Sequence, residues 1–250
     1  MDWALPSLVA LAFLLEAILG FGSTVIVVTV GAQFLPLDVL LPTYVPVNML
    51  LSGYLVVRYR DQVDGALLVR RILPFMGLGL VAGLCVPGTV PRPILLGGFG
   101  VFVMALALPE VWALVRPSTG VSPTARPPLS RGAAAAVLGA GGFIHGLFGS
   151  GGPMVVYFTG RERLDKAAFR ATLSALWLVL NAVLVGSFVS RGLLDESTLL
   201  RSAGLLPALL LGAVIGEVLH ARVDVKVFRA LVYTLLFAAG MSLALRSFFA

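Results

Sequence analysis

Two glycine-rich stretches hold the residue types best suited to binding chemistry. One is Leu147-Phe148-Gly149-Ser150-Gly151-Gly152-Pro153, and a shorter copy, Gly20-Phe21-Gly22-Ser23-Thr24, comes earlier in the chain. Because glycine weakens a helix interior while serine and proline favour a helix start, each stretch predicts a break between two half-helices. We expect Ser23 and Ser150 to be the N-cap residues of the second half-helices, and Pro153 to lie in a first turn.

The start of each second half-helix is suited to an anion, because it presents unpaired N–H groups and the positive end of the helix dipole. The residues predicted to bind substrate at the two breaks are Gly20, Phe21, Gly22, Ser23, Thr24, Phe148, Gly149, Ser150, Gly151 and Gly152. The alternative for either break alone is a kink that lets helices pack closely, since glycine is common in membrane helices. A matched pair of breaks favours binding.

Two asparagines, Asn48 and Asn181, lie inside apolar segments. Their amides can donate hydrogen bonds to an oxyanion, so both are predicted to bind substrate as well. The alternative is a structural role, in which each amide joins neighbouring helices through a hydrogen bond of about 0.6 kcal/mol. Both roles are compatible with the sequence.

Glu16 and His145 are ionisable residues in the first limbs of the two broken segments. An ionisable group at membrane depth costs on the order of 3 kcal/mol, which makes each a candidate for function. We therefore assign both as candidates for coupling transport to a proton or a sodium ion, since histidine titrates near neutral pH. The alternatives are a local partner or a protonated side chain for Glu16, and a hydrogen bond from His145 to a backbone carbonyl.

The composition is that of a helical membrane protein. Of its 250 residues, 59% are hydrophobic and only 12% are charged, about half the charged share of a soluble domain. Apolar runs of about 20 residues recur along the chain, which predicts an all-α polytopic membrane protein. The net charge of +6 does not indicate nucleic-acid binding, because the basic residues lie between the apolar runs and favour a role in membrane orientation. Cys85 is the single cysteine, so no thiolate metal cluster is expected.

Hydrophobicity and proline content divide the chain into two halves and a linker. The predicted domains are an N-terminal repeat at 1–115, a cytoplasmic linker at 116–131 and a C-terminal repeat at 132–250. Each half is predicted to hold a broken segment followed by three straight helices. The predicted segments are 5–34, 39–57, 72–86 and 94–115 in the first half, and 133–159, 167–190, 202–221 and 227–248 in the second.

The two halves match each other in sequence. Phe21-Gly22-Ser23 aligns with Phe148-Gly149-Ser150 at a shift of 127 residues. After an insertion the shift is 133, and the matched residues are Asn48 with Asn181, Gly53 with Gly186, Arg58 with Arg191, Pro74 with Pro207, Gly79 with Gly212, and Gly83 with Gly216. These matches predict a structural repeat, and the paired glycines predict close helix packing in both halves.

The basic residues predict how the segments cross the membrane. If each broken segment is re-entrant, 14 of the 18 Lys and Arg residues share one side, as the positive-inside rule requires. If the broken segments cross instead, the split is 10 to 8, which gives no orientation. The re-entrant arrangement leaves each half with three crossings, so the halves are predicted to be inverted repeats with both termini outside the cytoplasm. Arg170 is predicted to extend to the cytoplasmic surface.

An intramembrane serine hydrolase is the alternative from another class, because Gly149-Ser150-Gly151 is similar to the motif around its nucleophile. Here Phe148 stands where a glycine is expected, and His145 lies five residues from the serine in the same segment. A second copy of the serine, at Ser23, has no purpose for a single nucleophile. We therefore expect no catalytic residue and no enzyme activity.

The Gly-Phe-Gly-Ser of the first half and the Leu-Phe-Gly-Ser-Gly-Gly-Pro of the second resemble the sulfite exporter TauE/SafE family, also called the toluene sulfonate uptake permease family. The resemblance covers essentially the whole chain. The sequence departs from the family pattern at Thr24-Val25, where a Gly or Pro pair is commoner. It implies a membrane protein that moves sulfite, thiosulfate or organosulfonates, with Gly22, Ser23 and 149–151 facing the substrate.

Together these inferences predict a secondary transporter, acting as an exporter of small sulfur-containing oxyanions such as sulfite or organosulfonates, by alternating access in the inner (plasma) membrane. A carboxylate or other small anion is the alternative substrate, and a non-transporting membrane scaffold is a further class. The expected partners are the anion, the lipid bilayer and a coupling proton or sodium ion, with a homo-oligomer as a candidate assembly. No nucleic acid, cofactor or metal is expected.

Overall fold

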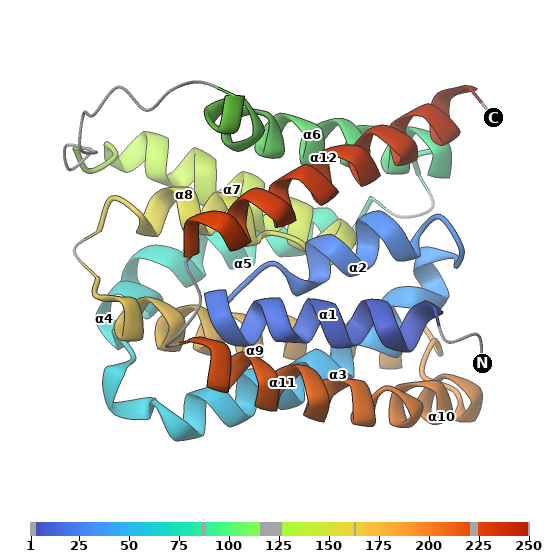
Figure 1. Ribbon diagram of the computed structural model, residues 1–250, viewed down its shortest axis with the longest axis horizontal. Helices are drawn as coiled ribbons and strands as arrows, with labels where there is room; N and C mark the ends of the chain where they lie inside the picture. The colour runs from blue at the N-terminus through green and yellow to red at the C-terminus, as the bar shows by residue number, and fades with distance from the viewer. Residues whose placement is uncertain (1–3, 87–88, 116–126, 163, 221–224, 250) are drawn as a thin grey trace.

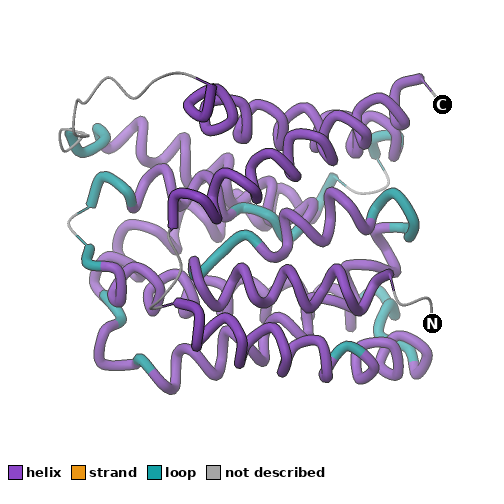
Figure 2. The backbone as a smooth tube through the Cα atoms, viewed as in Figure 1, coloured by secondary structure: helices purple, strands orange, loops and turns teal. Residues whose placement is uncertain are grey.

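The computed structural model is a bundle of helices, and it describes residues 4–86, 89–115, 127–162, 164–220 and 225–249. Figure 2 shows helices joined by loops, with no strand in this part of the chain. The helices of the first half are α1 (Ala4–Leu19), α2 (Ser23–Gly31), α3 (Leu37–Arg58), η1 (Arg60–Gln62), α4 (Gly65–Leu67), η2 (Leu68–Ile72), α5 (Leu73–Leu84) and α6 (Arg92–Val115). The helices of the second half are α7 (Arg131–Phe148), α8 (Gly152–Thr159), α9 (Lys166–Ser190), α10 (Glu196–Gly204), α11 (Leu206–His220) and α12 (Val225–Phe249).

The long helices have the length and composition of membrane spans. Among the described residues, five stretches are long and apolar enough to cross a bilayer: Leu37–Arg58, Gly65–Leu84, Arg92–Pro109, Lys166–Ser190 and Glu196–Leu219. Shorter apolar helices occupy Leu5–Ile18 and Tyr233–Phe248. The prediction of an all-α polytopic membrane protein is therefore confirmed. Most of the predicted linker at 116–131 lies outside the described residues.

Each broken segment folds back on itself at its glycines. Gly20 and Gly22 have φ values of 81° and 102°, and Gly149 has a φ of 64°, a backbone region that residues with a side chain rarely adopt. In Figure 1, α1 begins at the right of the bundle and α2 returns to that side, whereas α7 begins at the left and α8 returns to the left. The two hairpins therefore approach each other from opposite ends, and the inverted-repeat relation of the halves stays a prediction.

The prediction that Ser23 and Ser150 cap the second half-helices is wrong. The N-cap residues are Gly22 for α2 and Gly151 for α8, and neither helix start has a side-chain capping bond. Gly22 has the left-handed conformation that glycine tolerates, and both serine hydroxyls bond to groups earlier in the chain instead. Pro153 lies in the first turn of α8, as predicted.

The glycines predicted to pack closely do so, each against the first helix of the other half. A Cβ added to Gly79 on α5 would lie 2.1 Å from the carbonyl oxygen of Gly139 on α7. A Cβ added to Gly212 on α11 would lie 2.5 Å from the carbonyl oxygen of Ala10 on α1. Helices that approach this closely touch backbone to backbone. Each hairpin is therefore held by a helix from the opposite half of the chain.

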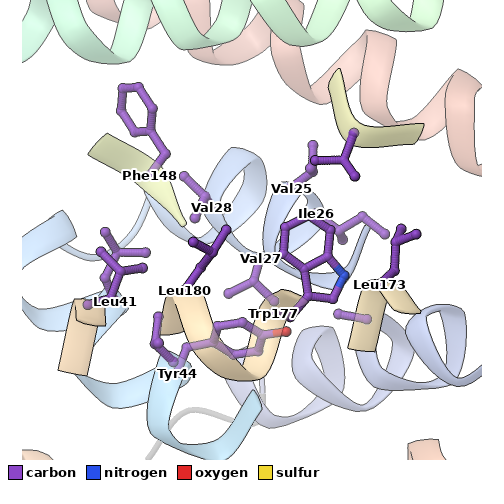
Figure 3. Packing of buried hydrophobic residues seen from close by; sticks show 14 of the residues in the cluster. Val25, Ile26, Val27, Val28, Leu41, Tyr44, Phe148, Leu173, Trp177 and Leu180 are labelled. Carbon is purple, nitrogen blue, oxygen red and sulfur yellow. The ribbon is translucent and has the colours of Figure 1, made fainter. Parts of the chain in front are cut away.

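The interior between the hairpins is formed by α2, α3 and α9. Figure 3 shows Tyr44 of α3 and Trp177 of α9 among apolar side chains that include Val25–Val28, Leu173 and Leu180. Tyr44 also stacks on Phe13 of α1, with ring centroids 5.3 Å apart. Among the side chains labelled in Figure 3, only Tyr44 and Trp177 carry a polar atom, the hydroxyl oxygen and the indole nitrogen. Because they are buried, these two atoms need hydrogen-bond partners.

Two spans begin earlier than their apolar runs predict. The segment expected from 202 begins at Glu196, because Asp195 accepts a hydrogen bond of 2.7 Å from the backbone N–H of Thr198. The segment expected from 72 begins at Gly65, because Asp64 accepts a hydrogen bond of 2.9 Å from the backbone N–H of Leu67. In both cases a capping carboxylate starts the helix before its strongly apolar part.

Candidate substrate site

The two glycine breaks meet at one buried cavity of about 20 Å³, which holds roughly one water molecule. Its lining comes from both halves of the chain. The lining residues are Glu16, Phe21, Gly22, Ser23, Thr24, Val25, Asn48, His145, Gly149, Ser150, Gly152, Trp177 and Asn181. The N-terminal ends of α2 and α8 thus lie at the same place, together with both predicted asparagines and both ionisable candidates.

Glu16 is the centre of a hydrogen-bond network on the first-half side of the cavity. Its side chain is buried, and its Oε2 accepts hydrogen bonds from Ser23 Oγ and, at 2.7 Å, from Asn48 Nδ2. The same amide nitrogen lies 3.3 Å from Ser23 Oγ and 3.3 Å from the Tyr44 hydroxyl. Asn181 Nδ2 in turn donates to Asn48 Oδ1 at 2.8 Å. The local partners expected for Glu16 therefore exist, and the asparagines do join helices.

His145 lies on the second-half side of the cavity in less polar surroundings. It is only 1% exposed, and neither ring nitrogen makes a hydrogen bond within the described part of the chain. Its ring stacks on Trp177, with centroids 5.6 Å apart, and Trp177 Nε1 donates to the carbonyl of Gly20 at 3.1 Å. Buried polar groups are normally paired, and these two ring nitrogens are not. The imidazole is therefore available to a ligand in the cavity.

Ser150 and His145 do not form the pair that a serine hydrolase requires. Ser150 Oγ donates to the carbonyl of Phe148 at 2.9 Å and makes no hydrogen bond to His145. A nucleophile of this kind needs a base within hydrogen-bonding reach.

Within the described ranges, no group of three or more His, Cys, Asp or Glu residues is placed to hold a metal ion.

Three of the residues predicted to bind substrate lie beside the cavity and not in its lining. The carbonyl of Gly20 is bonded from α9, and the ring of Phe148 stacks on Phe99 of α6 at 4.4 Å between centroids. Gly151 packs against α7, where an added Cβ would lie 2.3 Å from the carbonyl oxygen of Gly141. These three residues shape the breaks while their neighbours face the cavity.

Two lining residues, Val25 and Trp177, are absent from the predicted set. Val25 follows the first break directly. Trp177 lies four residues before Asn181 on α9 and matches Tyr44 at the shift of 133. A matched pair of aromatic residues one turn before a matched pair of asparagines was the signal that could have identified it.

Arg170 is buried and does not extend to a surface, which corrects the prediction for this residue. It is 5% exposed, and its Nη1 lies 3.0 Å both from the carbonyl oxygen of Ala17 and from Glu217 Oε1. Its guanidinium lies 4.3 Å from the ring centroid of Tyr59, whose hydroxyl donates to Glu217 Oε2 at 3.0 Å. The end of α1 has carbonyls without helical partners, and Arg170 binds one of them from the other half.

A second cavity, of about 300 Å³, lies at the far end of α2. Its lining residues are Ala32, Gln33, Arg92, Pro93, Leu96, Leu243, Arg246 and Ser247. It therefore holds two exposed arginines and, among the described residues, no carboxylate. Because α2 begins at the first cavity and ends at the second, it links a buried polar cavity to an open, positively charged one.

The comparisons with known proteins identify a single family. The family described as Sulfite exporter TauE/SafE matches residues 5–243, which include both hairpins and every residue of the buried cavity. No curated protein and no solved structure matches the chain. The chain therefore belongs to the sulfite exporter TauE/SafE family of membrane transporters.

Proposed function

We propose that this chain is a secondary transporter that exports small sulfur-containing oxyanions, such as sulfite or organosulfonates, across the inner membrane. The observation that carries the proposal is the meeting of the α2 and α8 N-termini at one buried polar cavity. Two opposed helix starts are an arrangement that suits a negative solute. Membership of the TauE/SafE family supports the class of substrate.

The cavity offers neutral hydrogen-bond donors for a compact oxyanion. The first N–H groups of each helix have no acceptor within the helix, and both helix dipoles direct their positive ends here. Hydroxyl and amide donors come from Ser23, Thr24, Asn48, Ser150 and Asn181. The lining has neither Lys nor Arg among the described residues, so we expect an affinity weak enough for the anion to be released.

The size of the cavity requires movement during transport. A volume of about 20 Å³ suits one water molecule, and a sulfite ion is several times larger. We expect the halves to act as inverted repeats, so that the hairpins separate first toward one face of the membrane and then toward the other. Glu16 and His145 line the same cavity, so either can sense the bound anion directly.

Anion binding to the purified protein tests the substrate class. Sulfite, thiosulfate, methanesulfonate, sulfate and acetate are compared by thermal shift in detergent. We expect the sulfur oxyanions to stabilise the fold by about 2.7 kcal/mol at a concentration of 100 times Kd. Stabilisation by acetate alone would make a carboxylate the substrate, and no stabilisation by any anion would contradict a transport site.

Accumulation of labelled sulfite or sulfonate in vesicles tests transport itself. Gly149→Leu should abolish accumulation, because Gly149 has a φ of 64° and an added Cβ would lie 3.1 Å from Thr24 Cγ2. The matched control is Gly132→Leu in the first turn of α7, the helix that ends just before Gly149, where an added Cβ meets no atom within 4 Å. Unchanged accumulation in the Gly149 variant would contradict a role for the breaks.

Ser150→Ala separates the transporter from a hydrolase. Ser150 contributes one hydroxyl among several donors, so the variant should retain part of its anion binding. A hydrolase would instead lose its chemistry completely with its nucleophile. Peptide cleavage by the wild type that disappears in Ser150→Ala would therefore replace the transport proposal.

A further inference from the structure

Two of the donors that the proposed function assigns to the substrate are bonded to a carboxylate of the chain itself. Ser23 Oγ, from the first residue of α2, and Asn48 Nδ2 both donate to the same oxygen of Glu16, Oε2. Glu16 belongs to α1, the other limb of the same hairpin. A side-chain carboxylate and a sulfur oxyanion have the same hydrogen-bonding character, because both accept and neither donates when ionised. The two therefore compete for one set of donors.

No cation faces Glu16 within the described part of the chain. The nearest segments contribute Asn48 and Tyr44 from α3, Ser23 and Thr24 from α2, and His145 from α7. Arg170 of α9 is engaged elsewhere, because its guanidinium bonds the carbonyl of Ala17 and pairs with Glu217 of α11. The titratable groups around Glu16 are thus the imidazole of His145, the phenol of Tyr44, and the ion pair between Arg170 and Glu217.

This environment makes two negative charges in the cavity very unfavourable. Burying a single carboxylate without a cation is already expensive, because few groups replace its hydration. A second anion at contact distance adds repulsion in a medium of low dielectric constant. Uptake of one proton by Glu16 removes both penalties, since the neutral carboxylic acid no longer needs the two donors.

We infer that a sulfur oxyanion binds this cavity only together with a proton on Glu16, so that each anion crosses the membrane with one proton. The inference rests on the proposed function of the cavity. The proton comes from water on the side to which the cavity is open and forms the O–H bond of the carboxylic acid. Ser23 and Asn48 then donate to the anion. On the opposite side the anion leaves, the proton returns to water, and the carboxylate regains its two donors.

Binding of methanesulfonate across a series of pH values tests this linkage. A sulfonate keeps its single negative charge from weakly acidic to weakly alkaline pH, whereas sulfite changes its own protonation in that range. The wild type should bind more weakly as pH rises, because rising pH removes the proton from Glu16. The apparent Kd should increase by up to about tenfold per pH unit, the limit for one linked proton.

Glu16→Gln carries a neutral amide in place of the carboxylic acid and cannot ionise. Its affinity should be independent of pH and close to that of the wild type at low pH. Glu196→Gln, at the exposed start of α10, is the matched control and should keep the wild-type pH dependence. His145→Gln should keep it too. A pH dependence that survives in Glu16→Gln, or that disappears only in His145→Gln, would overturn the inference.

Proton movement provides a second readout, which does not depend on measured affinities. Proteoliposomes that contain a pH-sensitive dye receive an imposed methanesulfonate gradient. We expect wild-type protein to carry protons in the same direction as the anion, and Glu16→Gln to carry the anion alone. Wild-type transport without proton movement, or with affinity independent of pH, would overturn this inference and leave the proposed function intact. A wild type that binds neither methanesulfonate nor sulfite at any pH would overturn both.

Discussion

Asn181 of α9 donates a hydrogen bond of 2.8 Å from Nδ2 to Oδ1 of Asn48 on α3, which joins two matched residues of the two halves of the chain. The amide nitrogen of Asn48 in turn donates a hydrogen bond of 2.7 Å to Glu16. The chain of amides therefore runs from the second half to the carboxylate of the first hairpin. A change on α9 can in this way alter the surroundings of Glu16.

Replacing Asn181 by leucine should lower both stability and anion affinity. The substitution leaves the buried Oδ1 of Asn48 without its donor, which we expect to cost about 1–2 kcal/mol. Val179→Leu, at an exposed position of the same helix, is the control for added volume. Thermal unfolding and methanesulfonate binding are measured on both variants. Reduced stability with unchanged affinity would leave the asparagine pair with a structural role alone.

Gly79→Ala should destabilise the fold, whereas Gly77→Ala on the same helix should not. A Cβ at Gly79 would lie 2.1 Å from the carbonyl oxygen of Gly139, while a Cβ at Gly77 meets nothing within 4 Å. Separating α5 from α7 to accommodate the methyl group should cost about 1–3 kcal/mol. Thermal unfolding of the two variants in detergent checks this difference. Equal stability of the two would contradict the backbone contact.

Arg170→Met should destabilise the protein by about 2 kcal/mol, because Glu217 loses its cation and the carbonyl of Ala17 loses the guanidinium donor. Adding Glu217→Gln to the same chain should recover part of the loss, since the unpaired carboxylate is removed. Unfolding measurements on both single variants and the double variant give the coupling between the two residues. Additive losses would mean that the ion pair contributes nothing as a pair.

Neutralising both arginines of the second cavity, Arg92→Gln with Arg246→Gln, should slow anion uptake into vesicles by a few-fold at low ionic strength. The positive charges of the two arginines raise the concentration of anions near the second cavity, and salt screens this attraction. Arg201→Gln, an exposed arginine of α10, is the control. Initial rates are measured at low and high salt. A defect of the same size at both salt concentrations would contradict electrostatic attraction.

Cysteine labelling tests the orientation that the basic residues predict. In a Cys85→Ser background, Glu196→Cys should react with an impermeant maleimide added outside the cell, and Asp61→Cys should react only after permeabilisation. Both positions are exposed, so a difference in labelling reports the side of the membrane. Ser118→Cys in the linker should behave like Asp61→Cys. The reverse pattern would place the termini in the cytoplasm.

The sequence alone identified the class of protein and the two breaks. Long apolar runs, a low charged fraction and glycines beside hydroxyl residues are local features, and local features decide where a helix spans a membrane and where it stops. The match of Asn48 with Asn181 also pointed to two residues that the structure brings together. Glycine spacing in Gly79 and Gly212 predicted close packing, because a missing side chain permits it in any context.

Only the tertiary structure decided which groups meet. Asn48 bonds Glu16 over 32 residues of chain, Trp177 bonds Gly20 over 157, and Arg170 is buried by partners on α1 and α11. Ser23 does not cap α2 as expected, because its hydroxyl donates to Glu16 on the other limb of the folded hairpin. A buried polar group must find a partner wherever the fold supplies one, and packing between distant segments determines which partners are within reach. For that reason residue types and spacing could predict most of the residues that line the cavity but not the hydrogen bonds that connect them.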